Sequence, residues 1–214
     1  PLDKLFNVDL LTIKPEHLKF LGEVTSLAVY ESNSRVFDKN GLFSESIFGI
    51  VGTQERMTKA GYIDLKIPII HPFAFKQLLD LDPIYDKIAS GKVKASFNQE
   101  AKVFLEDPKG STGFEFLMSY LDQVEFRSTG AKSRDFAIAL IKKALQKENL
   151  IRYFYVIPAG MRDIELDAKG RPTQDEINTL YAKMIGSVNT IRNNSIKESN
   201  YSQFDPYRYR VQLI

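Results

Sequence analysis

The 214-residue sequence contains no cysteine and only two histidines. The absence of cysteine excludes disulfide bonds and thiolate metal sites. A tetrahedral structural zinc site needs four sulfur or imidazole ligands, and two histidines cannot supply them. We therefore expect no zinc in this chain.

The sequence also lacks a strong charge imbalance and a long apolar run. It has 29 basic and 27 acidic residues, so any contact with nucleic acid has to come from local patches. No apolar run approaches the ~18 residues of a membrane-spanning helix, and the first residues are not basic and then apolar. We expect a cytoplasmic protein with no membrane contact, made of one ordinary domain or two small ones.

The clearest local pattern is an amphipathic helix in the C-terminal third. Thr173 and Glu176 form a Thr-x-x-Glu capping box, which predicts a helix that begins near Gln174 and runs for about 18 residues. Its apolar side recurs at steps of three and four, at Ile177, Leu180, Tyr181, Met184, Ile185, Val188 and Ile191. The opposite side, which includes Asn178, is expected to be polar, and Asn193 or Asn194 is expected to end the helix in left-handed geometry.

The remaining patterns predict short strands and helices in a mixed α+β fold. Strands are expected at 62–67, within 93–107 and at 153–157, and helices at 72–79, after Pro83, after a second capping box at Thr112 and Glu115, and after the basic linker 127–134. His71 stands directly before the proline that opens a helix, which favours a structural role. The end, 207–214, alternates aromatic and basic residues, typical either of an edge strand or of a surface that stacks bases.

Two charged stretches allow more than one interpretation. In the linker, Arg127, Lys132 and Arg134 could contact phosphates or simply be solvated. In the long loop 159–172, alternate acids at Asp163, Glu165 and Asp167 could share a face and bind Mg²⁺, or form a charged loop face without metal. Loops of this length are uncommon unless they are functional or disordered.

Several sequence blocks occur in an order that resembles one protein family. The blocks are Phe6–Asp9, Gly22–Thr25, Gly41–Gly49, Glu55–Met57, Gly61–Leu65 with Pro68 and His71, Val156–Pro158, Arg162, Gly170–Arg171 and Glu176–Tyr181. They resemble the N-terminal clamp and lid region of the largest, β′-type, subunit of multisubunit DNA-directed RNA polymerases. Cellular members carry a four-cysteine zinc ribbon between the segments that correspond to Gly41–Gly49 and Glu55–Met57, where this chain has only 50–54, so we expect a divergent, phage-encoded type.

The resemblance implies a fold and a role. The expected fold is a mixed clamp core at 1–152, a protruding lid loop that leads into the first clamp helix at 153–194, and a tail or edge strand at 195–214. The region would form a wall of the DNA/RNA cleft and separate the transcript from the template, with Arg162, Lys169 and Arg171 on the nucleic acid. No catalytic residue is expected, because the family's magnesium motif is absent; Mg²⁺ would act in the assembled nucleotidyltransferase.

The implied partners are a β-like chain, the rest of a β′-like chain, template DNA and nascent RNA. An initiation factor docks on two clamp helices in the family, and only the first of them is convincing in this sequence. The alternative function is a non-enzymatic, clamp-like regulator that binds a host RNA polymerase. A third hypothesis is a metal nuclease built on the three alternate acids of the loop.

Overall fold

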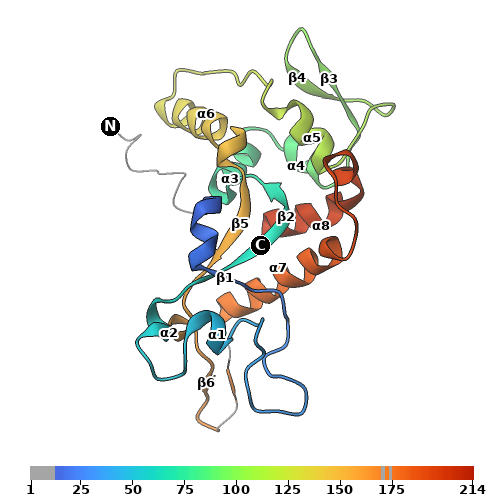
Figure 1. The fold of residues 1–214 in the computed structure, drawn as a ribbon. Helices are drawn as coiled ribbons and strands as arrows, with labels where there is room; N and C mark the ends of the chain where they lie inside the picture. Colours follow the sequence, from blue (N-terminus) through green and yellow to red (C-terminus); the bar gives the residue numbers. More distant parts are fainter. Residues whose placement is uncertain (1–12, 170–171, 174) are drawn as a thin grey trace. The chain divides into compact units, whose positions relative to one another are not determined.

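The computed structural model describes residues 13–169, 172–173 and 175–214, which form two compact units, each assembled from separate stretches of the chain (Figure 1). Unit 1 contains 67–151 and 194–213, and unit 2 contains 13–66 and 152–193 together with Ile214. The chain changes unit inside strand β2 (Gly61–Ile69) and at the start of strand β5 (Ile151–Val156). The expected segments 1–152, 153–194 and 195–214 therefore do not coincide with the units.

The expected mixed α+β class is confirmed, with small sheets among many helices. Strand β1 (Gly22–Glu23) pairs in parallel with β2, and β2 lies between β1 and β5. The strand expected at 62–67 is present within β2, where Ile63, Leu65 and Ile67 are buried. In the described part of the chain, no helix has the length and apolar character needed to cross a bilayer.

Unit 1 packs helices around an aromatic and aliphatic core. Its elements are α3 (Pro72–Leu81), α4 (Ile84–Ala89), β3 (Ala95–Asn98), β4 (Val103–Glu106), α5 (Phe114–Leu121), α6 (Lys132–Ala144), the 3₁₀ helices Lys147–Asn149 and Glu198–Phe204, and α8 (Asp205–Leu213). The expected helix at Pro72 is confirmed, and His71 caps it by accepting a hydrogen bond from the Phe73 amide at 3.2 Å. The structural role expected of His71 is thus confirmed.

The second capping box is wrong, because α5 receives its cap from a distant segment. The helix begins after Gly113, and the Glu115 amide donates to Asp205 Oδ1 at 3.0 Å, across 90 residues of sequence. The Thr112 hydroxyl instead donates to the Val93 carbonyl at 2.6 Å. Gly113 has φ +104°, and a Cβ there would lie 2.1 Å from Asp205 Oδ2, so glycine is required for this approach.

The C-terminal segment is also not a strand. Residues 205–213 form helix α8, which contacts α5 within unit 1 (Figure 1). Arg208, Val211 and Gln212 share its buried side. The Gln212 amide pairs with both backbone groups of Ile70, accepting from its N–H at 2.8 Å and donating to its carbonyl at 2.9 Å. Of the alternating aromatic and basic residues, Arg208 is buried on this side and Arg210 is exposed.

Asp205 should make the stability of unit 1 depend on pH. Burial and the neighbouring Glu115 raise the pKa of Asp205 to about 6, against the Glu115 and Phe114 amides and Arg208, which lower it. The folded state then binds more protons than the unfolded chain between about pH 4 and 6, so stability falls as pH rises through that window and levels off above it. Relative to Asp205→Asn, the wild type should lose about 2 kcal/mol between pH 4 and 7. Urea titrations of both proteins at several pH values would measure this difference, and parallel pH profiles would contradict it.

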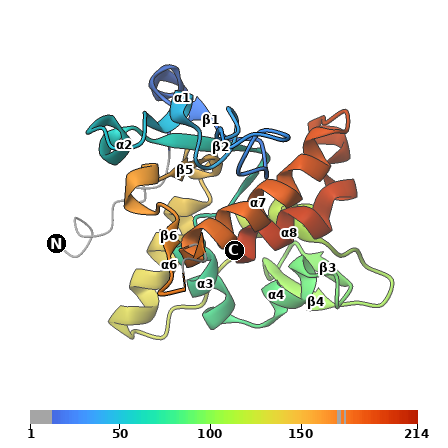
Figure 2. The same cartoon turned by 90° about the horizontal axis from the view of Figure 1, so that it is seen from below.

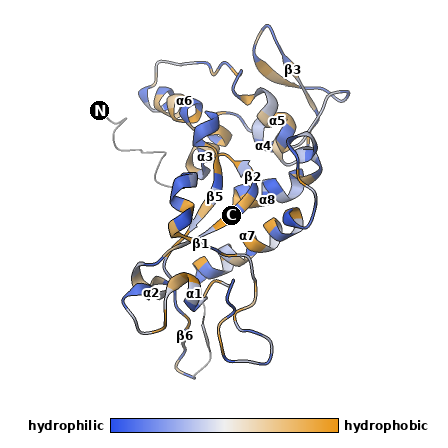
Figure 3. Cartoon of the chain, in the orientation of Figure 1, coloured by the Kyte–Doolittle hydropathy of each residue, from blue (hydrophilic) through white to orange (hydrophobic). Residues whose placement is uncertain are grey.

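In unit 2 a long helix is tied to the sheet, because Tyr181 donates to the Tyr155 carbonyl at 3.2 Å and Arg192 pairs with Glu23 across 2.8 Å. The elements of unit 2 are the 3₁₀ helices Pro15–Phe20 and Ala159–Met161, β1, α1 (Glu45–Phe48), α2 (Glu55–Thr58), β6 (Glu165–Leu166), β7 (Pro172–Thr173) and α7 (Glu176–Arg192). Helices α1 and α2 lie next to each other, with α1 beside β1 (Figure 2). Helix α7 carries both polar and apolar residues along its length (Figure 3).

Helix α7 confirms the expected amphipathic helix but corrects its ends. Asp175, not Thr173, is the N-cap, and its side chain accepts from the Ile177 amide. Thr173 lies in β7 and donates its hydroxyl to the Glu165 carbonyl at 3.1 Å. Asn193 ends the helix with φ −73°, so the expected left-handed stop is not formed at this residue. Leu180, expected on the inner side, is 36% exposed.

Candidate functional site

The long charged loop expected before α7 contains a short hairpin. Strand β6 pairs antiparallel with β7, with Glu165 opposite Thr173 and Leu166 opposite Pro172, and the hairpin projects from unit 2 (Figure 1). Lys169 is exposed in the connection, and its amide donates to Asp167 Oδ1 at 2.8 Å. Gly170 and Arg171, which also belong to the expected lid, lie outside the described residues.

Arg162 lies at the base of this hairpin and is only 2% exposed. Its Nε donates to the Ile157 carbonyl at 3.0 Å, and its Nη1 donates to Asn178 Oδ1 at 2.9 Å. The Asn178 amide donates back to the Arg162 carbonyl at 2.7 Å. Two side chains from the hairpin base and α7 thereby fix each other.

Aromatic rings surround the same guanidinium. The Arg162 Cζ lies 5.6 Å from the ring centroid of Phe43, 4.8 Å from that of Phe48 and 5.6 Å from that of Tyr181, all within cation–π range. The Tyr181 hydroxyl accepts from the Ile157 amide and donates to the Tyr155 carbonyl, each at 3.2 Å. Burial lowers the pKa of Arg162 to about 10, so the group remains charged at neutral pH.

The expected contact of Arg162 with nucleic acid is therefore not supported by its position. A guanidinium that is enclosed by three rings and bonded to the backbone has no free path to a phosphate. Sequence reasoning placed Asn178 on the polar side of α7, whereas it is 1% exposed because it pairs with Arg162. The sequence offers one signal for this pair, an arginine shortly before a helix whose expected polar side carries an asparagine.

A second buried arginine holds the other side of the hairpin base. Arg56, from α2, is 2% exposed and forms an ion pair with Asp163, with Nη2 and Oδ1 2.7 Å apart. Its Nη1 donates to the carbonyls of Phe43 and Gly49 at 3.3 and 3.2 Å. Within the part of the chain that the structure describes, no group of three His, Cys, Asp or Glu side chains could hold a metal ion. The hypothesis of a metal nuclease on Asp163 and its neighbouring acids thus finds no support.

The basic linker lies in unit 1. Arg127 and Lys132 are exposed, and Lys132 is the first residue of α6. The Arg134 Nε donates to the Arg127 carbonyl at 2.8 Å, which ties the linker to the helix. Arg127 and Lys132 are thus surface residues. Arg134 also has a structural role.

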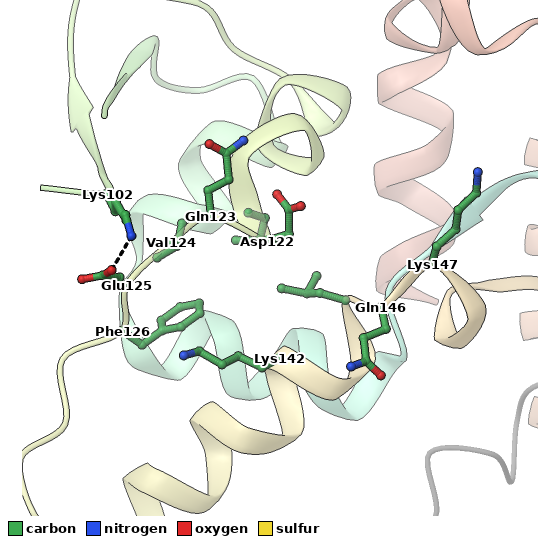
Figure 4. Close-up of a pocket in the computed structure, with 11 residues that line it drawn as sticks. Lys102, Asp122, Gln123, Val124, Glu125, Phe126, Lys142, Gln146 and Lys147 are labelled. Carbon is green, nitrogen blue, oxygen red and sulfur yellow. Dashed lines mark hydrogen bonds and ion pairs between the residues drawn. The ribbon is translucent and has the colours of Figure 1, made fainter. Parts of the chain in front are cut away.

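Unit 1 also contains a pocket of about 700 Å³ that sequence reasoning missed (Figure 4). The buried side chains of Leu121 and Val124 line it, and its rim carries both signs of charge. Lys102 pairs with Glu125 across 2.6 Å, and this hydrogen bond lowers the pKa of Glu125. Lys142 points across the pocket toward Phe126. The pocket is formed by Lys102 and by residues from 121–126 and 142–147. Because these stretches are separated in sequence, no local motif predicts the pocket.

Comparison of the sequence with known proteins identifies no relative. No protein-family model matches the sequence, and no curated protein matches it either.

Proposed function

We propose that this chain is the clamp and lid portion of a β′-like subunit of a multisubunit DNA-directed RNA polymerase. In the assembled enzyme it would form a wall of the DNA/RNA cleft, and the β6–β7 hairpin would separate the transcript from the template. The chain itself would perform no bond-making step, and Mg²⁺ would be bound by another part of the enzyme.

One observation supports this proposal most directly. Blocks that carry the resemblance, although far apart in sequence, supply the residues that meet at the hairpin base. Phe43 and Phe48 come from the Gly41–Gly49 block, Arg56 from the Glu55–Met57 block, and Asn178 and Tyr181 from the block that opens α7. If the chain has the fold of this family, residues that match the family pattern are expected to pack together.

The base of the hairpin has the properties that a strand-separating loop requires. Two buried arginines and an N-capped 17-residue helix hold it from different elements. The connection between β6 and β7 carries the exposed Lys169, which is available for a phosphate. We assign the phosphate contact to Lys169 and, from sequence alone, to Arg171, and leave Arg162 as the anchor.

Co-purification tests the proposal against its alternative. A polymerase subunit should purify with a β-like chain and the remaining β′-like chain when all three are expressed together. A clamp-like regulator should instead purify with an intact host RNA polymerase. Recovery of the chain alone under both conditions would contradict both functions.

Replacing Lys169 by alanine should impair transcript release in the assembled enzyme without impairing assembly. The loss of one phosphate contact should reduce the salt dependence of nucleic-acid binding by about one unit of slope. Hybrid length and RNA release in a stalled elongation complex would measure the effect. Lys183→Ala on the exposed side of α7 is the matched control, and an identical response of the two variants would count against a role for the hairpin connection.

A further inference from the structure

The pocket of unit 1 has no part in the proposed strand separation. It holds about 700 Å³, and all of its lining residues belong to unit 1. Pockets that bind ligands typically hold about 300–1,000 Å³. The pocket is therefore large enough for a ligand group, and what it binds depends on unit 1 alone.

The apolar part of the lining comes from the end of α5, the segment after it and the end of α6. Leu121 and Val124 are buried, and Phe126 and Leu145 are half-buried. Half-buried apolar groups gain from a ligand that removes the rest of their surface from water. An apolar side chain of a ligand fits this part of the pocket.

The charged groups beside the apolar lining favour an anionic ligand. Residues 127–147 contain six basic residues and one acidic residue, although the whole chain has 29 and 27. One lysine of the lining is already paired with a glutamate. Among the residues that the structure describes, Lys142, Lys147 and Asp122 of the lining form no ion pair, so two ammonium groups and one carboxylate are free. The side chain of Lys142 crosses the pocket, where it can meet a bound carboxylate (Figure 4).

Two glutamine side chains add groups that match a peptide backbone. Gln123 and Gln146 lie on opposite sides of the pocket (Figure 4). Gln146 uses its Oε1 to accept from Asn149, and Gln123 uses its Nε2 to donate to the Ser119 carbonyl at 3.5 Å. The Nε2 of Gln146 remains a donor and the Oε1 of Gln123 remains an acceptor. A peptide chain presents a carbonyl and an N–H at each residue, which are the partners that these two atoms need.

We propose that this pocket binds a short acidic segment of a partner protein. An apolar side chain of the segment packs on Phe126 and Leu145, its flanking Asp or Glu carboxylates pair with Lys142 and Lys147, and the two glutamines bond to its backbone. A nucleic-acid strand fits less well, because it would bring one negative charge per nucleotide to a rim that also carries Asp122. The binding of this segment does not depend on the proposed function of the β6–β7 hairpin.

Selection of random displayed peptides on the full chain tests the class of ligand. The enriched peptides should combine Asp or Glu with a central large apolar residue. Charge reversal by Lys142→Glu with Lys147→Glu should abolish this preference. Lys94→Glu with Lys109→Glu, which changes two exposed lysines of unit 1 outside the pocket, should retain it. No enrichment, enrichment of peptides without acids, or the same peptides on the wild type and both double variants would overturn the proposal.

Titration of the most enriched peptide measures the individual contacts, with binding followed by NMR at the Glu125 amide and the Gln146 side-chain amide. The Lys142→Glu and Lys147→Glu double variant should weaken binding by about 10-fold, and the control double variant by less than about twofold. Replacing the apolar residue of the peptide by alanine should also weaken binding by about 10-fold, because less apolar surface is buried.

A single-stranded oligothymidylate, titrated at the same ionic strength, separates a peptide site from a phosphate site. It should bind more weakly than the peptide, and tighter binding would assign the pocket to nucleic acid and refute the proposal. Because these experiments use the isolated chain, their failure is distinguishable from a failure to assemble with polymerase subunits.

Discussion

Replacing Arg162 by alanine is expected to lower the free energy of unfolding by about 3–5 kcal/mol. The change removes a side chain enclosed by three aromatic rings and leaves the Ile157 carbonyl and Asn178 Oδ1 without their donors. Both a cavity and unpaired buried acceptors result, and the two effects add. Urea unfolding followed by circular dichroism, with amide exchange of α7, measures the loss.

Two further variants separate packing from surface charge. Lys169→Ala removes a cation from the exposed connection of the same hairpin and should change stability by less than about 0.5 kcal/mol. Arg162→Lys keeps the charge but loses the planar fork, so it should remain clearly destabilising. If Arg162→Ala were as stable as Lys169→Ala, the guanidinium would not anchor the hairpin.

Replacing Arg208 by alanine is expected to lower the free energy of unfolding by about 3–4 kcal/mol through unit 1. Arg208 is 3% exposed, pairs with Glu115 and donates from Nε to the Pro68 carbonyl at 2.8 Å. Its Cζ also lies 4.7 Å from the ring centroid of Phe114. Removing Arg208 takes this donor from the Pro68 carbonyl and breaks the ion pair that links α8 to α5.

The matched control lies two residues further along α8. Arg210 is exposed and contacts only the ring of Tyr207 in the described structure, so Arg210→Ala should change stability by less than about 0.5 kcal/mol. Both variants lose an arginine from the same helix, which removes differences in helix propensity and net charge. Equal unfolding midpoints in urea would contradict the assigned role of Arg208.

Local patterns predicted element types where one face of the chain had to be buried. The stripe from Ile177 to Ile191 identified α7, and Pro72 identified the start of α3, because helical period and proline geometry act within a few residues. Cap identities failed for the opposite reason. Thr112 and Thr173 have the right spacing for caps, yet Asp205 and Asp175 provide them. Asp205 satisfies the Glu115 amide that Thr112 was expected to cap, and tertiary packing makes that choice. Asp175 instead caps the Ile177 amide, because α7 begins two residues later than expected.

The sequence by itself determined the mixed α+β class, most helix and strand positions and the structural role of His71, since these depend on neighbours along the chain. Only the tertiary structure decided that Arg162 is an anchor, that Asn178 is its partner and that 205–213 is a helix. The sequence near a helix does not indicate whether a basic side chain faces solvent or is enclosed by aromatic rings. Its environment is set by Phe43 and Phe48, more than 100 residues earlier in the chain, and such long-range contacts leave no local pattern.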